Sequence, residues 1–96
     1  MSRRGFITDR SGSITAGGTA QSLCSASTNR RYIFIENISS GDLWVDIGVT
    51  AVADQPSIKI VAGAAFVMED QFVATGPFSI IGATTGQKFV AKEGFA

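Results

Sequence analysis

The stretch of sequence that decides the fold is YIFIENISSGDLWVDIG, residues 32–48. In its first half, Ile33 and Ile35 fall on one face of an extended chain, because successive side chains of a strand point to opposite faces. Tyr32 and Phe34 fall on the other face. Since both faces are apolar, one covers a core, and the other points toward solvent or a neighbouring subunit. The pattern therefore predicts a strand with two outward-facing aromatic residues.

The second half of the stretch alternates as a half-buried strand does. Apolar residues stand at every second position from Leu43, and Trp44 shares the opposite face with Asp46. The loop between the two halves, Ser39–Asp42, contains a glycine together with serine and aspartate side chains that bond nearby backbone. We therefore predict a β-hairpin, and we expect Tyr32, Phe34 and Trp44 to form one exposed apolar patch at a subunit interface. The alternative is that a loop or the N-terminal segment of the same chain covers them.

Working outward from this stretch, short β-branched and aromatic runs recur between glycine, serine, asparagine and aspartate, and helical spacing is not maintained. The pattern predicts an all-β fold, a compact antiparallel β-sandwich that is jelly-roll-like, with about eight short strands. Residues 57–69 predict a second hairpin, and residues 78–92 a third. The predicted strands are Ser13–Ala16, Thr19–Cys24, Arg31–Ile38, Leu43–Gly48, Ser57–Val61, Ala65–Glu69, Phe78–Ile81 and Lys88–Lys92.

Length and composition point to one small domain that assembles. The chain has 96 residues, 45% of them hydrophobic and 17% charged, whereas about 25% of residues are charged in a typical soluble domain. Few charges are thus available to cover a small surface. The formal net charge of +0 does not favour binding to nucleic acid or to an anionic membrane. No apolar run reaches the length of about 18 residues that a membrane-spanning helix needs.

The first twelve residues differ in charge from the rest of the chain. Three arginines and one aspartate give residues 1–12 a local charge of +2, whereas residues 13–96 carry −2. We predict an extended N-terminal arm over residues 1–12, flexible or held by a partner, and a β-sandwich domain over residues 13–96. The arginines are not followed by an apolar run of the kind found in a secretory signal, so we expect synthesis in a cytoplasm.

Catalytic and metal-binding chemistry has little support in the sequence. Cys24 is the single cysteine, and histidine is absent, so the partners for a Cys/His nucleophile or a zinc site are missing. The carboxylates follow no calcium-loop spacing, and the glycines do not form a phosphate loop. We expect a protein that is not an enzyme, with no catalytic, cofactor-binding or metal-binding residues.

Several stretches resemble a family of small tailed-bacteriophage proteins, the capsid decoration or cement proteins. They are NRRYIFIENISSGDLWVDIG (29–48), QPSIKIVAGAAF (55–66) and FVATGPFSIIGATTGQKFVAKEG (72–94), and the resemblance covers residues 13–94. It implies a β-sandwich protein, often a homotrimer, made in the cytoplasm of the host bacterium. Such a protein sits on the outer capsid surface of the virion and ties neighbouring major capsid protein subunits together.

On this hypothesis two groups of residues make the contacts. The arm binds the shell, because arginine suits bidentate pairing with acidic side chains, and the outward aromatic residues pack between subunits. The alternative is a head-fibre or tail-associated module in which Trp44 and Tyr32 stack on the sugar rings of a host glycan or receptor. The shell-binding candidates are Arg3, Arg4, Phe6 and Arg10, and the subunit-interface candidates are Tyr32, Phe34 and Trp44.

Overall fold

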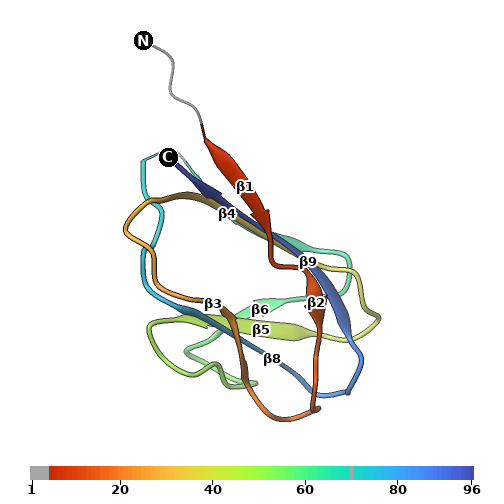
Figure 1. Ribbon diagram of the computed structural model, residues 1–96. Coiled ribbons are helices and arrows are strands. Elements are labelled where there is room, and N and C mark those ends of the chain that lie inside the picture. The colour runs from red at the N-terminus through yellow and green to blue at the C-terminus, as the bar shows by residue number, and fades with distance from the viewer. Residues whose placement is uncertain (1–4, 70) are drawn as a thin grey trace.

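The computed structural model describes residues 5–69 and 71–96, which form two antiparallel sheets packed face to face (Figure 1). Sheet A has the strand order β1-β9-β4-β7, with β2 also paired to β9, and sheet B has the order β3-β8-β5-β6. The prediction of an all-β, jelly-roll-like sandwich is confirmed. No helix among the described residues is long and apolar enough to cross a membrane. The strands are β1 (Phe6–Asp9), β2 (Gly12–Ser13), β3 (Gln21–Cys24), β4 (Arg30–Asn37), β5 (Leu43–Ile47), β6 (Ile58–Ile60), β7 (Ala65–Met68), β8 (Phe78–Gly82) and β9 (Lys88–Phe95).

Successive strands mostly alternate between the two sheets, so the three predicted hairpins are wrong. β4 lies in sheet A and β5 in sheet B, and the same change of sheet separates β6 from β7 and β8 from β9. The loop Ser39–Asp42 is therefore an arch over the edge of the sandwich. Turn residues between two alternating runs suit an arch as well as a hairpin. Here the chain crosses because the apolar faces of β4 and β5 bury more surface against each other than side by side.

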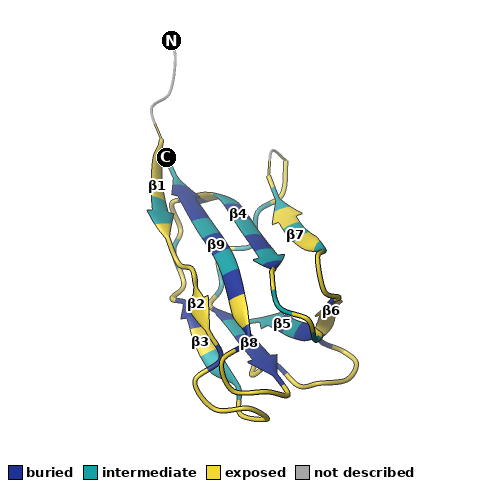
Figure 2. Ribbon diagram, turned by 90° about the vertical axis from the view of Figure 1, so that its right-hand side faces the viewer, coloured by how far each residue is buried: buried dark blue, intermediate teal, exposed yellow. Residues whose placement is uncertain are grey.

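The core lies between the sheets and takes one face of each strand. Ile33 and Ile35 of β4 point inward and are fully buried, whereas Tyr32 and Phe34 point outward, as the alternation predicts. β9 alternates in the same way, which is visible as buried and partly buried bands along its ribbon in Figure 2. The principal buried apolar residues are Ile14, Leu23, Cys24, Ile33, Ile35, Leu43, Val45, Ile60, Phe78, Ile80, Phe89 and Ala91.

The N-terminal segment belongs to the sandwich from residue 6 onward. β1 pairs antiparallel with β9, with Phe6 opposite Phe95 and Asp9 opposite Lys92, and β2 continues along the same edge. This corrects the prediction of a separate arm over residues 1–12 for the part that the structure describes. The edge of β9 offers unpaired backbone groups, and an extended segment satisfies them at no cost in side-chain burial.

A buried ion pair links β4 and β9 within sheet A, and its arginine reaches across the core to sheet B. The side chain of Arg30 is 0% exposed, and its Nε donates to Glu93 Oε2 at 2.8 Å. The guanidinium carbon lies 5.1 Å from the centre of the Phe78 ring. All five N–H donors of this guanidinium have acceptors, so the charge is fully compensated. The remaining acceptors are Cys24 Sγ and the carbonyl oxygens of Ser25, Ala74 and Gly76.

Candidate assembly surface

The outer face of sheet A carries a stripe of apolar side chains, with charged residues among them. Phe34 of β4 lies between Lys92 of β9 and Val67 of β7, and the next row of the sheet brings Val90 beside Glu36. Val67 is 42% exposed, and Phe34 and Val90 are partly buried. None of the described loops is bonded across this face. The outward aromatic residues of β4 therefore remain available for contact with another protein.

Tyr32 and Ile7 close over a glycine at the end of the stripe. Gly94 of β9 stands opposite both residues in the sheet register. A Cβ on Gly94 would lie 2.9 Å from Tyr32 Cβ and 3.2 Å from Ile7 Cδ1, so only glycine leaves room for this contact. Beside them is an open recess of about 330 Å³, lined also by Arg31 and Phe95. The recess is an apolar concave surface beside the cationic side chain of Arg31.

An ion pair on the same face holds the end of β1. Lys92 Nζ lies 3.1 Å from Asp9 Oδ1, and Ser11 Oγ donates to the same oxygen at 2.6 Å. These hydrogen bonds, that of Ser11 first and that of Lys92 second, lower the pKa of Asp9 from its ordinary 3.8 to about 2. Both side chains of the pair are solvent-exposed, so the contact adds little to global stability. Its effect is local, on the edge strand.

Part of the outer face of sheet B is covered by its own chain. The loop of residues 48–57, here the cover loop, folds back over this sheet. Its Ala51 N–H donates to Ser79 Oγ at 3.0 Å, and Ser57 Oγ donates to Asp46 Oδ2 at 3.0 Å. Ser57 Oγ also accepts the N–H of Val52 at 3.0 Å, and Ala51 is only 1% exposed. These bonds satisfy the polar groups of sheet B within the chain.

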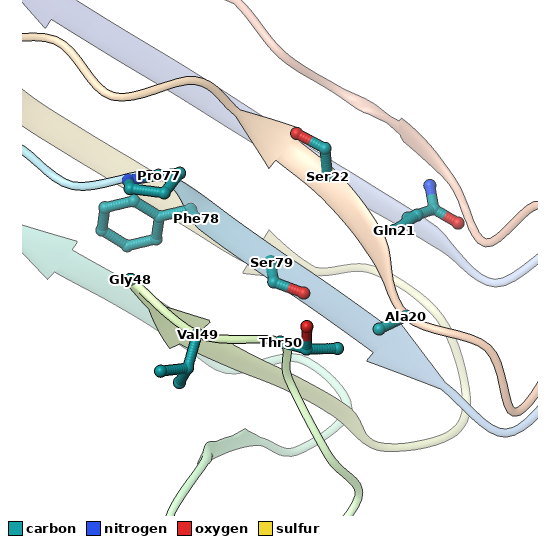
Figure 3. Close-up of a pocket in the computed structure, with 9 residues that line it drawn as sticks. All are labelled: Ala20, Gln21, Ser22, Gly48, Val49, Thr50, Pro77, Phe78 and Ser79. Atoms are coloured by element: carbon teal, nitrogen blue, oxygen red, sulfur yellow. The ribbon is translucent and has the colours of Figure 1, made fainter.

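An open groove of about 370 Å³ remains between the cover loop and β3 (Figure 3). Ser79 lies on its floor, between Thr50 of the cover loop and Ser22 of β3. The lining carries hydroxyl groups but no charged side chain. Within residues 5–69 and 71–96, no three of the side chains that bind metals come together. The groove offers shape and weak hydrogen bonding, without the convergent charged groups of a catalytic site.

The predicted interface residues do not form one patch. Tyr32 and Phe34 lie on the outer face of sheet A, whereas Trp44 lies on the outer face of sheet B, where it stands opposite Lys59 and Ile81. The single patch expected from the three aromatic residues is therefore wrong, because β4 and β5 belong to different sheets. Lys59 Nζ lies 5.7 Å from the centre of the Trp44 ring, which gives the indole an intramolecular cationic partner.

The shell-binding candidates fall into three situations. Arg3 and Arg4 lie outside the described residues. Phe6 is 71% exposed on the edge strand β1. Arg10 donates from Nε to Glu93 Oε1 at 2.9 Å, so the buried carboxylate that holds Arg30 also holds the N-terminal segment. Part of the Arg10 guanidinium remains exposed, but its Nε is already bonded to Glu93 of the same chain.

Two residues of this surface were not foreseen from the sequence. Ile7 is 65% exposed on β1, and Val67 is exposed on β7, at the two margins of sheet A. The pattern of residues 6–9 is too short for a strand prediction, and Val67 belongs to a strand that was predicted without its sheet position. Residues 5–8, GFIT, contain two large apolar residues and no charge, and this is the signal in the sequence that could have indicated Ile7.

Comparisons with known proteins show the fold. No family model matches the chain, and no curated protein matches it significantly. The structure is similar to a solved protein of Bacillus endospore appendages, which are described as a novel family of disulfide-linked pili. The TM-score is 0.50 at 15% sequence identity, over 96% of this chain and 88% of that chain. At this identity the likeness establishes a common fold and nothing further.

Proposed function

We propose that this chain is a non-enzymatic structural protein of a bacteriophage virion, a capsid decoration or cement protein. In this role it binds the outer face of the assembled head and stabilises contacts between major capsid protein subunits. One observation carries the proposal: on the outer face of sheet A, Phe34 and Val67 have no covering loop among the described residues, whereas the chain's own loop lies over part of sheet B. A surface of the first kind suits contact with other proteins. The resemblance in residues 13–94 supplies the kind of assembly.

Self-association and shell binding use different parts of sheet A in this proposal. Phe34 and Val67 pack against neighbouring copies of the chain. Arg3 and Arg4, together with the exposed Phe6, engage the shell at the end where β1 begins. A homotrimer presents three such ends at once, so each contact can be weak while the trimer binds tightly. Binding to the assembled head stabilises that state by linkage.

The contacts between copies are non-covalent in this proposal. The neighbour from Bacillus appendages is described as forming disulfide-linked pili. The present chain has one cysteine, Cys24, which is buried beside the Arg30 guanidinium. Burial raises the pKa of the Cys24 thiol, which makes it less reactive. Assembly therefore depends on buried apolar surface and strand edges.

Phage heads prepared without this chain provide the test. Purified protein added to such heads should sediment with them to a saturating, fixed number of copies, and should raise the temperature at which the heads release DNA. The variant Phe34→Thr should bind with lower affinity, and Lys59→Ala on the opposite face should bind as the natural chain does. Absence of sedimentation with heads would refute the proposal, and binding to host polysaccharide instead would favour the head-fibre or tail module.

A further inference from the structure

The two edges of sheet A are less protected than those of sheet B. β1 and β7 are both four residues long, and neither has a register irregularity. Their single charge is Asp9, which is paired with Lys92. In sheet B, β3 has a register shift, and β6 has three residues, one of them Lys59. Short strands, bulges and lysines are the devices that stop sheet edges from pairing with other chains. The edge strands of sheet A contain neither a bulge nor a lysine.

The strand count of sheet A makes its two margins complementary. Each strand along β1-β9-β4-β7 is antiparallel to the next, so β1 and β7 run in opposite directions. Figure 2 shows these strands at opposite margins of the sheet, with β9 and β4 between them. A second copy placed alongside, with the same face outward, therefore brings its β7 antiparallel to β1. The contact is head-to-tail and leaves one edge of each copy open for the next.

The hydrogen-bond pattern defines which residues of β1 face the open edge. Arg10 N donates to Ala91 O at 2.7 Å, so the backbone groups of residue 10 point toward β9. Because these directions alternate along an antiparallel strand, the N–H and C=O groups of Ile7 and Asp9 point away from β9. Their side chains share the outer face of the sheet with Lys92 and Gly94.

The same reasoning applies to β7. Asn37 N donates to Ala64 O at 2.9 Å, so the carbonyl of residue 64 points toward β4. The backbone groups of Ala65 and Val67 therefore point to the open edge. The side chain of Val67 is on the outer face, opposite Phe34. The two edges thus present matching sets: on each, the residues with free backbone groups have outward side chains.

We propose that β1 of one copy pairs with β7 of the next, with Ile7 opposite Val67 and Asp9 opposite Ala65. Sheet A then continues from subunit to subunit. This inference deepens the proposed self-association and rests on it. In this register each of the four residues of β1 stands opposite one residue of β7, and no like charges face each other.

The pairing also removes exposed apolar side chains of these edges from water. Ile7, which is 65% exposed, meets Val67, which is 42% exposed, on the outer face. Phe6 is the first residue of β1, so it ends the junction beside the residues that are proposed to engage the shell. A single junction of this length is weak, but a closed ring of three copies makes three junctions at high effective concentration. Phe34 stands beside Val67 in the sheet, so it borders the junction with the next copy.

Cysteine cross-linking between two different variants tests the pairing. Ile7→Cys protein and Val67→Cys protein are mixed and oxidised, and covalent products are identified by mass spectrometry. Residues directly opposite in a hydrogen-bonded pair lie about 5.5 Å apart at Cα, within disulfide range. We expect a dimer of one chain of each variant, and no cross-link when either variant is oxidised alone. Both positions are exposed, so neither substitution disturbs the core.

Matched controls separate this pairing from chance collisions. Val61→Cys is similarly exposed but lies after β6, and mixed with Ile7→Cys it should give no dimer. Cross-linking of Ile7→Cys with itself would overturn the head-to-tail arrangement. Trimers by light scattering without a mixed cross-link would overturn the edge pairing and leave the proposed self-association intact. Monomers at all concentrations, again without a cross-link, would overturn both.

Discussion

The two outer faces of the sandwich are built from similar strands but differ in how far the chain's own loops cover them. On sheet B the cover loop turns back, and its Ser57 hydroxyl donates to Asp46 of β5. On sheet A, Phe34 and Val67 have no such cover among the described residues. The chain covers part of one face with ten of its own residues and leaves the apolar side chains of the other without a covering loop. This difference supports the proposal that other proteins contact sheet A.

Both outer faces depend on the stability of the interior between the sheets. A substitution of Arg30 tests how much the buried ion pair contributes to that stability. Arg30→Ala removes five hydrogen bonds and leaves the Glu93 carboxylate buried without its main partner. We expect a loss of about 3–5 kcal/mol in the free energy of unfolding, measured with urea. The control is Arg31→Ala on the same strand, where the exposed side chain bonds only to nearby carbonyls, and a change within about 0.5 kcal/mol is expected. Equal losses for the two variants would refute the role of the buried pair.

The cover of sheet B is tested by Ser57→Ala. This change leaves the Val52 N–H without its acceptor and Asp46 Oδ2 without its Ser57 donor. Because the group is nearly buried, we expect a loss of about 1–3 kcal/mol in unfolding free energy and faster hydrogen exchange across the cover loop. Ser22→Ala, at an exposed position on β3, should change stability by no more than about 0.5 kcal/mol. If the cover loop exchanges no faster in Ser57→Ala, the cover does not depend on these bonds.

The uncovered face of sheet A is tested by Phe34→Thr. Threonine keeps a residue that suits a strand, so the isolated chain should lose about 1 kcal/mol or less. Assembly should fall much more, because the central aromatic of the stripe is gone, and the trimer should dissociate at higher protein concentration in analytical ultracentrifugation. Lys59→Ala, on the face of sheet B, should leave the dissociation concentration unchanged. Equal effects of the two variants on assembly would remove the distinction between the faces.

The smallest predicted effect concerns the ion pair between Asp9 and Lys92, which fixes the end of β1. The folded pKa of Asp9 is about 2, below its ordinary 3.8, so its carboxylate stabilises the folded strand above the ordinary value. That contribution is lost as the pH falls through about 2. We expect the NMR amide signals of Ile7 and Thr8 to report loosening between about pH 4 and about pH 2, while β9 stays ordered. Asp9→Asn should remove this pH dependence, and an unchanged profile in that variant would contradict the role of the ion pair.

Local alternation was sufficient to predict most strands and their buried faces. Ile33 and Ile35 are buried and Tyr32 and Phe34 point outward, as the residues 32–48 imply, because the two-residue period is a property of the backbone itself. The same local signal could not tell an arch from a hairpin. That choice depends on which distant face a strand covers, and it placed Trp44 on the other side of the molecule.

The remaining features depend on contacts between residues far apart in the sequence. Arg30 and Glu93 are 63 positions apart, and neither has a sequence neighbour that suggests the pair. β1 is a strand because β9 has an open edge, and its own four residues carry no strand pattern. The open edges of sheet A follow from strand order, which the sequence left undecided between a jelly roll and other sandwiches.

The central claim is that copies of this chain assemble through sheet A. Light scattering of the intact protein over a wide concentration range, beside the Phe34→Thr variant, tests it most directly. The account predicts a mass near three times the 10.0 kDa of one chain, falling toward 10.0 kDa in the variant. A mass of 10.0 kDa for the intact protein at every concentration would contradict it.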